Sequence, residues 1–124
     1  IYRRALRTIP GITVLEDFPD VETNYAYFPI LVDHDAYGLS RDELNSTLKL
    51  FNINTRKYFY PLCSHFPCYA ALPSSRPDLL PVAEKVSQQV LCLPLYGNLE
   101  EEIANNLCTI LKELHHIAKK QANV

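Results

Sequence analysis

A helix-capping signature between strand-like segments does most to define the fold of this 124-residue chain. Ser40 and Glu43 have the spacing of a capping box, in which both side chains accept hydrogen bonds from backbone N–H groups at a helix start. Leu44, Leu48 and Phe51 then follow on one apolar stripe. We therefore expect a helix from the serine to the phenylalanine. Capping accounts for the serine better than a role as a catalytic nucleophile, because no base or nucleophile-elbow motif accompanies it.

Segments on either side of this helix favour β-strands. ITVLEDF at residues 12–18 is short and partly alternating, and NYAYFPILVD at residues 24–33 is apolar on both faces, which indicates a strand covered on both sides. Pro29 cannot donate to a ladder, so it predicts an edge position or a bulge. After the helix, the β-branched and aromatic residues of NINTRKYFYPL, residues 52–62, predict a strand that ends at Pro61.

The second half of the chain begins with a loop. Residues 63–80 contain three prolines and no long periodic run, which is typical of a loop with functional potential. Pro81 suits the first turn of a short helix over PVAEKVSQQ, and the apolar run VLCLPL at residues 90–95 predicts a buried strand.

A long amphipathic helix is predicted to follow. Asn98 and Glu101 form a second capping signature. Acidic residues at the start and basic residues at the end match the helix dipole, so His115 and His116 are interpreted as solvated end charges rather than a metal pair. The apolar stripe is expected to consist of Leu99, Ile103, Leu107, Ile110, Leu111, Leu114 and Ile117.

The order of these elements does not strictly alternate between strand and helix. It therefore predicts an α+β fold, in which three or four mainly antiparallel strands pack against helices on at least one face. A chain of this length can bury a core without a disulfide or a metal.

The composition argues against several classes of protein. The net charge is −2 and the basic residues are scattered, so no basic stripe indicates nucleic-acid binding. The apolar runs are shorter than the roughly 20 residues that a membrane span needs. Gly11, Gly38 and Gly97 are isolated, which excludes a glycine-rich phosphate loop in this segment.

The four cysteines do not form a zinc motif. Cys63, Cys68, Cys92 and Cys108 include no CxxC pair, and the four histidines supply no second pair of ligands. Cys92 and Cys108 lie in apolar runs and are interpreted as buried small hydrophobes. Because no charged-then-apolar leader is present, we expect reduced thiols and a cytoplasmic location.

The first eleven residues show a helical pattern that has no beginning of its own. The sequence contains no methionine and begins at Ile1, within a helical pattern that stops at Pro10 and Gly11. We interpret this pattern as the tail of a helix and expect the chain to be part of a longer protein.

Several blocks in fixed order resemble one enzyme family. NYAYFPI, RDELNSTLKLFNI, NTRKYFYPL, FPCY and PVAEKVSQQVLCLPLYGNLEEE are similar to the C-terminal small domain of nucleotide-sugar aminotransferases of the DegT/StrS type. These are pyridoxal-phosphate (PLP) enzymes of fold type I, and the resemblance covers roughly the last hundred residues. It implies that residues 1–11 end an interdomain connecting helix and that residues 12–124 form the aminotransferase small domain.

The resemblance implies that the full-length protein transfers an amino group, usually from glutamate, to a keto sugar carried by a nucleoside diphosphate. In this family the reactive lysine, the acid facing the pyridine nitrogen and most phosphate ligands belong to the large domain. No catalytic, cofactor-binding or metal residue is therefore expected here, and PLP is expected only in the full-length enzyme. The expected partners are the nucleotide sugar and the missing large domain, in an enzyme that is usually a homodimer.

Substrate contacts are expected between residues 55 and 69. Arg56 suits a phosphate or carboxylate, Tyr58 and Tyr60 suit a ring, and His65 suits a sugar hydroxyl or a phosphate. Strand alternation would place the arginine and both tyrosines on one face, so packing against a helix or the large domain is the alternative. The Tyr-Phe-Tyr-Pro-Leu run resembles the family members that act on 6-deoxy keto sugars.

A second class of function fits the same pattern of elements. A free-standing α+β ligand-binding or regulatory module would show the same strands and helices. It would not account for the absent methionine or for the ordered family blocks.

Overall fold

The computed structural model describes residues 1–122 and is built on a three-stranded antiparallel sheet. The strands are β1 (Ile12–Val14), β2 (Phe28–Val32) and β3 (Val90–Leu93), with β2 in the centre. Ile12 pairs with Val32 at one end of β2, and Phe28 pairs with Leu93 at the other. The expected α+β fold with a mainly antiparallel sheet is confirmed.

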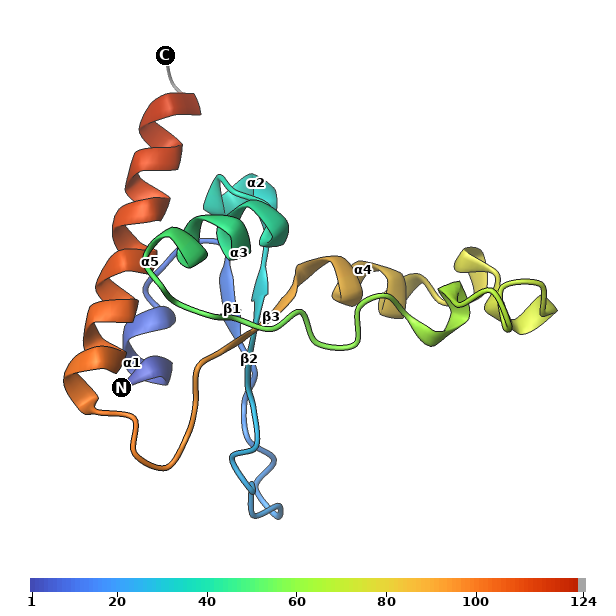
Figure 1. Cartoon of the computed structure of the whole chain (residues 1–124), viewed down its shortest axis with the longest axis horizontal. Coiled ribbons are helices and arrows are strands. Elements are labelled where there is room, and N and C mark those ends of the chain that lie inside the picture. The colour runs from blue at the N-terminus through green and yellow to red at the C-terminus, as the bar shows by residue number, and fades with distance from the viewer. Residues whose placement is uncertain (123–124) are drawn as a thin grey trace.

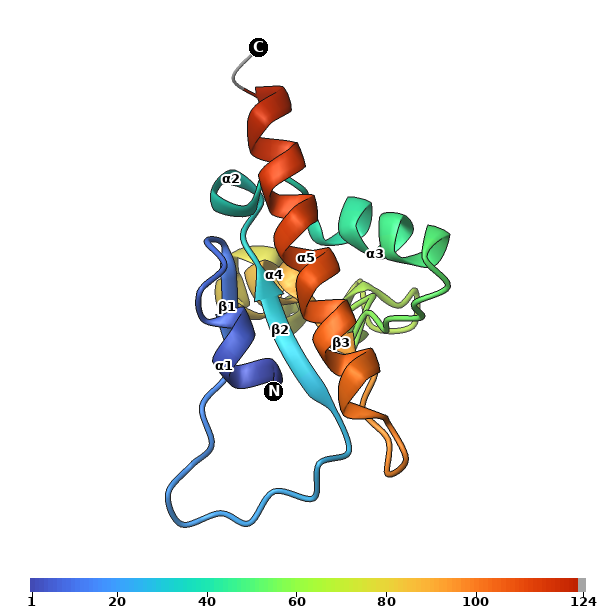
Figure 2. The ribbon, with the colours of Figure 1, turned by 90° about the vertical axis from the view of Figure 1, so that its left-hand side faces the viewer.

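Within residues 1–122, five α-helices and three short 3-10 turns surround or extend the sheet. Helices α1 and α5 lie side by side against one face of it, and their inner side chains share a single core with α3 (Figures 1 and 2). The helices are α1 (Tyr2–Leu6), α2 (His34–Tyr37), α3 (Arg41–Leu50), α4 (Pro81–Gln89) and α5 (Glu101–Ala122). The 3-10 turns are η1 (Cys63–His65), η2 (Pro73–Ser75) and η3 (Pro77–Leu79).

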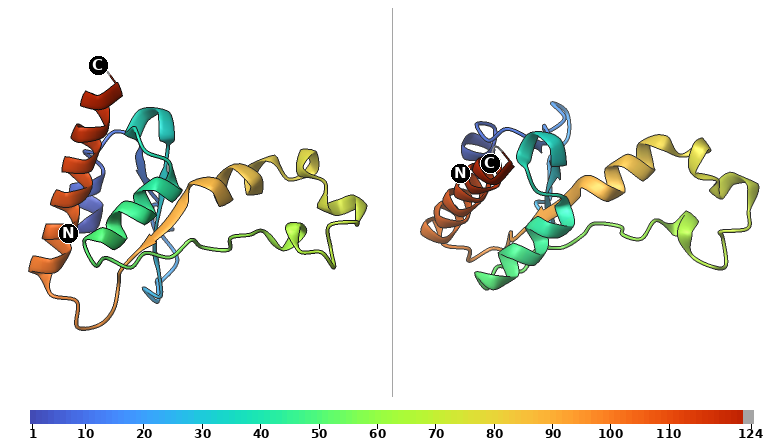
Figure 3. Two further views of the ribbon diagram at one scale, coloured as in Figure 1. Left: turned by 45° about the horizontal axis from the view of Figure 1, so that its top comes forward. Right: turned by 90° about the horizontal axis from the view of Figure 1, so that it is seen from above.

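Residues 57–89 leave the body of the molecule as an elongated arm (Figures 1 and 3). Its outgoing leg is an extended segment, residues 57–62. The three 3-10 turns form its far part, and α4 returns to the sheet as the second leg. The predictions of a proline-rich loop, of a short helix starting at Pro81 and of a buried strand after it are all confirmed.

Helix α3 begins as its capping signature predicted. The Ser40 hydroxyl accepts a hydrogen bond from the Glu43 N–H, and the Glu43 carboxylate accepts one from the Ser40 N–H at 2.7 Å. Leu44 and Leu48 are fully buried. Phe51 does not continue this stripe, because the helix ends at Leu50 and leaves the ring exposed.

The apolar stripe predicted for α5 is confirmed in part, since Leu107 and Leu111 are buried and Leu99, Ile110 and Leu114 pack against the core. Ile103 and Ile117 are about half exposed, at 48% and 51%. Small side chains let α1 and α2 approach the helix closely, so the buried face also includes alanines and a cysteine. That face consists of Ala104, Leu107, Cys108, Leu111, His115 and Ala118. The helix starts at Glu101, three residues after Asn98, so the predicted asparagine cap is wrong.

The two histidines near the end of α5 have different environments. His116 is exposed, as expected, but His115 is only 7% exposed, so its prediction as a solvated charge is wrong. Its Nδ1 lies 2.9 Å from the carbonyl oxygen of Tyr37, and the Tyr37 hydroxyl donates to the carbonyl of Leu111 at 2.7 Å. These polar contacts fasten the end of α2 to α5 within the core.

Two strand predictions need correction. Residues 52–62 do not form a strand: Arg56 makes one isolated bridge to Cys92, and Asn52 and Phe59 have positive φ angles of 59° and 47°. Such angles are incompatible with continuous pleating.

Pro29 lies in the central strand rather than an edge strand, but it lies beyond the end of β1, whose last pair is Val14 with Ile30. Pro29 pairs with Cys92 of β3, but the backbone N–H and C=O of Cys92 both form hydrogen bonds with Arg56 on the other side. The pair is therefore not hydrogen-bonded, and β3 requires no N–H from Pro29.

We expect the fold to lose stability in alkaline solution through two buried tyrosines. Burial raises the pKa of Tyr2 to about 12, with smaller contributions from Cys108 and Tyr96, and raises the pKa of Tyr37 further. Above about pH 10 the unfolded chain releases phenolic protons that the folded chain retains, so the free energy of unfolding falls as the pH rises.

Urea unfolding at pH 8, 10 and 11, followed by circular dichroism, measures this effect. Tyr2→Phe should reduce the fall in stability between pH 10 and 11, whereas Tyr25→Phe, at an exposed position, should leave it unchanged. Equal pH dependence in the two variants would contradict the assignment.

Candidate functional site

Arg56 and Tyr58 come together around Tyr27. The backbone of Arg56 is fixed by two hydrogen bonds with Cys92 of β3, at 3.1 and 2.8 Å. Its guanidinium donates to the Tyr27 hydroxyl at 3.4 Å and lies 5.8 Å from the centre of that ring. The rings of Tyr27 and Tyr58 are 4.9 Å apart. We call these three residues the Arg56 cluster; a cationic group held against aromatic rings is suited to anionic or ring-bearing ligands.

A cavity of about 600 Å³ opens beside this cluster, between α5, residues 51–56 and the segment that follows β3. Its volume is in the range of small-molecule sites. The wall is mainly apolar, and its polar residues are three asparagines, three tyrosines and the arginine. Its lining residues include Tyr27, Arg56, Asn54, Tyr96, Ile103 and Ile110. Ile103 and Ile110 of α5 therefore form one wall of this cavity.

Tyr60 lies at a different place from the Arg56 cluster. The Arg41 guanidinium is 4.7 Å from the centre of the Tyr60 ring and the Lys57 ammonium is 5.3 Å from it. The tyrosine borders a second cavity of about 440 Å³ at the start of α3, together with Ser40 and Gln89. The expected common face of Arg56, Tyr58 and Tyr60 is wrong, since the positive φ at Phe59 interrupts the alternation.

Charged side chains link α3 to the segment that carries Tyr60. One oxygen of Asp42 lies 2.6 Å from both the Arg41 Nε and the Lys57 Nζ. The hydrogen bond from Lys57, assisted by the charge of Arg41, holds the pKa of Asp42 below its usual value. No sequence pattern indicated a role for Arg41 or Asp42, because charged residues directly after a capping serine ordinarily face solvent.

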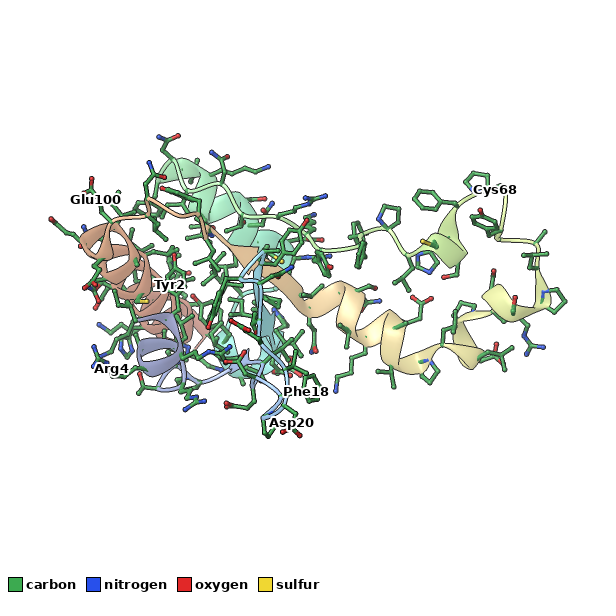
Figure 4. The ribbon with its side chains drawn as sticks, turned by 90° about the horizontal axis from the view of Figure 1, so that it is seen from below. Tyr2, Arg4, Phe18, Asp20, Cys68 and Glu100 are labelled. Carbon is green, nitrogen blue, oxygen red and sulfur yellow. The ribbon has the colours of Figure 1, made fainter. Side chains whose placement is uncertain are left out.

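His65 lies on the arm, away from both cavities. Its Nε2 is 2.7 Å from the Glu84 carboxylate, so this pair joins η1 to α4 across the arm. Cys68 marks the far end of the arm in Figure 4. The structure thus brings Arg56 and Tyr58 together, places Tyr60 beside α3 and places His65 on the arm. Their roles as ligand contacts stay predictions.

Cysteines can bind a metal and lysines can bind PLP, so their positions indicate whether the described residues contain such sites. Cys92 and Cys108 are buried as predicted, and burial raises the pKa of both thiols, whereas Cys63 and Cys68 are exposed. Within residues 1–122, no three His, Cys, Asp or Glu side chains converge as a metal site would require. No lysine lines either cavity, and the Lys57 ammonium is engaged by Asp42.

Among residues 1–122, no helix is both long and apolar enough to cross a membrane.

Comparison with known proteins identifies relatives over most of the length of this chain. The model of the DegT/DnrJ/EryC1/StrS aminotransferase family matches residues 1–112. A dTDP-4-amino-4,6-dideoxy-D-glucose transaminase of Escherichia coli is 46% identical over 111 residues, covering 90% of this chain and 30% of the relative. A transaminase of the same name from Shigella dysenteriae is 36% identical over 113 residues, covering 91% of this chain and 30% of the relative.

A solved structure agrees with these relatives. The crystal structure of DesI, determined in the presence of its TDP-sugar product, superposes with a TM-score of 0.84 at 25% identity. The match covers 98% of this chain and 31% of that protein. The chain therefore spans about 30% of the length of the relatives that it matches.

Proposed function

Because the chain belongs to the DegT/DnrJ/EryC1/StrS aminotransferase family, we propose that it forms the C-terminal small domain of a nucleotide-sugar aminotransferase. The observation that carries this proposal is the family match over residues 1–112, together with relatives of which the chain covers only about 30%. In this proposal residues 1–11 end the connecting helix and residues 12–124 form the small domain, of which residues 123–124 lie outside the described structure. A free-standing regulatory module has no support in these comparisons.

The reaction proposed for the full-length protein is transfer of an amino group from glutamate to a nucleoside-diphosphate keto sugar. The names of the Escherichia coli and Shigella dysenteriae relatives support a dTDP-linked 4-amino-4,6-dideoxy sugar as the product class. Membership of the family supports PLP as the cofactor of the full-length protein. We also propose a homodimeric assembly and a cytoplasmic location for it, as the sequence resemblance implies.

The residues of this chain do not by themselves fit a PLP site. PLP needs a lysine amine and an acidic partner in a shared pocket, and neither cavity described above contains a lysine. We therefore place the cofactor-binding and catalytic groups in the large domain and derive no chemical step from this chain. Its own contribution would be to shape and close the substrate site, where the Arg56 cluster is suited to a diphosphate or a ring.

Two proteins assayed in parallel test the proposal. The full-length protein that carries this sequence should convert glutamate to 2-oxoglutarate when given PLP and a dTDP-4-keto-6-deoxy sugar. The 124-residue chain should neither bind PLP stoichiometrically, as read from visible absorbance, nor release 2-oxoglutarate. Omitting the nucleotide sugar is the control. Absence of turnover by the full-length protein with nucleotide keto sugars, or a stoichiometric PLP spectrum from the 124-residue chain, would contradict us.

A further inference from the structure

Arg41 is the largest polar side chain buried in the described structure, at 2% exposed, and it lies outside the Arg56 cluster. It occupies the first position of α3, directly after the capping serine. Burying a guanidinium is costly unless its donors are satisfied, so its partners need an explanation. The family match covers residues 1–112 together and assigns no role to Arg41.

The partners of Arg41 lie on both legs of the arm and at the start of β3. Its Nη1 donates to the carbonyl oxygen of Ser87 at 2.9 Å and to that of Val90 at 3.2 Å. The Ser87 carbonyl is among the last of α4, which have no intrahelical N–H partner, so the arginine caps the end of the returning leg. The same guanidinium stacks on Tyr60, which belongs to the outgoing leg.

Asp42 adds a second connection to the outgoing leg. Its carboxylate bridges the Arg41 Nε and the Lys57 Nζ, at 2.6 Å each. The first two residues of α3 therefore contact each leg where it joins the sheet. Beyond this point the arm projects away from the body of the molecule (Figures 1 and 3). A projecting segment is oriented by the contacts at its base.

We propose that Arg41 is a positioning residue that sets the direction in which the arm leaves the sheet, with Asp42 supporting it through Lys57. Because α3 is fixed in the core by Leu44 and Leu48, its first residues form a rigid point of attachment. The inference about the arm is independent of the proposed function. Only the further step, that the direction of the arm places Tyr60 and His65 for contact with substrate, rests on the proposed function.

The direction of the arm can be measured in the 124-residue chain with two spin labels. One label is attached to Cys68 at the far end of the arm, and the other to Ser46→Cys on the exposed side of α3, in a Cys63→Ser background. Burial and raised pKa values protect Cys92 and Cys108 from the reagent. Pulsed electron spin resonance then gives the distribution of distances between the two labels.

With arginine at position 41 we expect one narrow distribution. Arg41→Met should make it roughly twofold broader, because both legs lose their attachment to α3 while the core stays folded. Arg41→Lys keeps the charge but cannot reproduce the forked contacts, so it should restore the width only in part. Arg76→Met is the matched control, since Arg76 lies on the arm and, among the described residues, pairs with Asp78 alone. It should leave the width unchanged.

A second variant covers the case in which Arg41→Met does not fold. Asp42→Asn combined with Tyr60→Leu removes the contacts to the outgoing leg and leaves the two carbonyl bonds of Arg41 in place. It should also broaden the distribution. Thermal melts by circular dichroism report separately on the fold. A folded Arg41→Met protein with the same width as Arg76→Met, or an unchanged width in the double variant, would overturn the proposal.

Discussion

Replacing Gly11 with alanine should destabilise the fold by at least about 2 kcal/mol, the sum of the lower estimates for a left-handed backbone and for overpacking. Gly11 connects α1 to β1 with a φ of 78°, a conformation that residues with a Cβ rarely adopt. A Cβ at this position would lie 2.3 Å from the backbone nitrogen of Tyr37 and 2.7 Å from its Cα. Because these are backbone atoms at the end of α2, they cannot move aside as a flexible side chain would.

Gly97→Ala is the matched control for this substitution. A Cβ at Gly97 would have no heavy atom within 4 Å, and its φ is not in the left-handed region. Thermal unfolding followed by circular dichroism should show a lower melting temperature for Gly11→Ala, by roughly 6–12 °C for a domain of this size. Gly97→Ala should melt close to the unaltered chain. Equal melting temperatures for the two variants would mean that α2 does not pack on this turn.

Local signals in the sequence were sufficient to predict the elements whose determinants lie close together. The helix at Ser40 was found because its cap and the Glu43 partner are three residues apart. The start of α4 at Pro81 and the buried strand after it followed from residue type alone. These features depend on neighbours in the chain, which a sequence pattern records directly.

The failures of prediction arise where distant segments decide the outcome. The α5 stripe was assigned to large apolar residues, but close packing of α1 and α2 selected Ala104, Cys108 and Ala118 for the buried face. The propensity of residues 52–62 for a strand was overridden by positive φ angles and by a single bridge to β3.

The candidate site illustrates the same limit. Arg56 and Tyr58 were predicted from residue type, but their partner Tyr27 is supplied by a segment 29 residues earlier than Arg56. Arg41 was not predicted at all. Its burial depends on carbonyl groups 46 and 49 residues later in the chain, and no local pattern indicates that a charged residue will meet them.

Removing the Arg56 side chain should weaken binding of the nucleotide sugar in the full-length enzyme. Hydrogen bonds to charged groups contribute about 1.5–3 kcal/mol, which corresponds to a KM about 10- to 150-fold higher for Arg56→Ala. We expect kcat to change much less, because the reacting groups are proposed to lie in the large domain. Arg56→Lys should give an intermediate KM, since an ammonium keeps the charge but not the forked geometry.

The control for Arg56→Ala is Arg4→Ala, which removes an exposed arginine from α1. It should leave KM and the melting temperature unchanged. The alternative role for Arg56, packing against a helix or the large domain, makes the opposite prediction: a lower melting temperature with an unchanged KM. Measuring KM for the nucleotide sugar and the melting temperature on the same preparations therefore separates a ligand contact from a structural one. An Arg56→Ala enzyme with the KM of the Arg4→Ala enzyme would remove the Arg56 cluster from the substrate site.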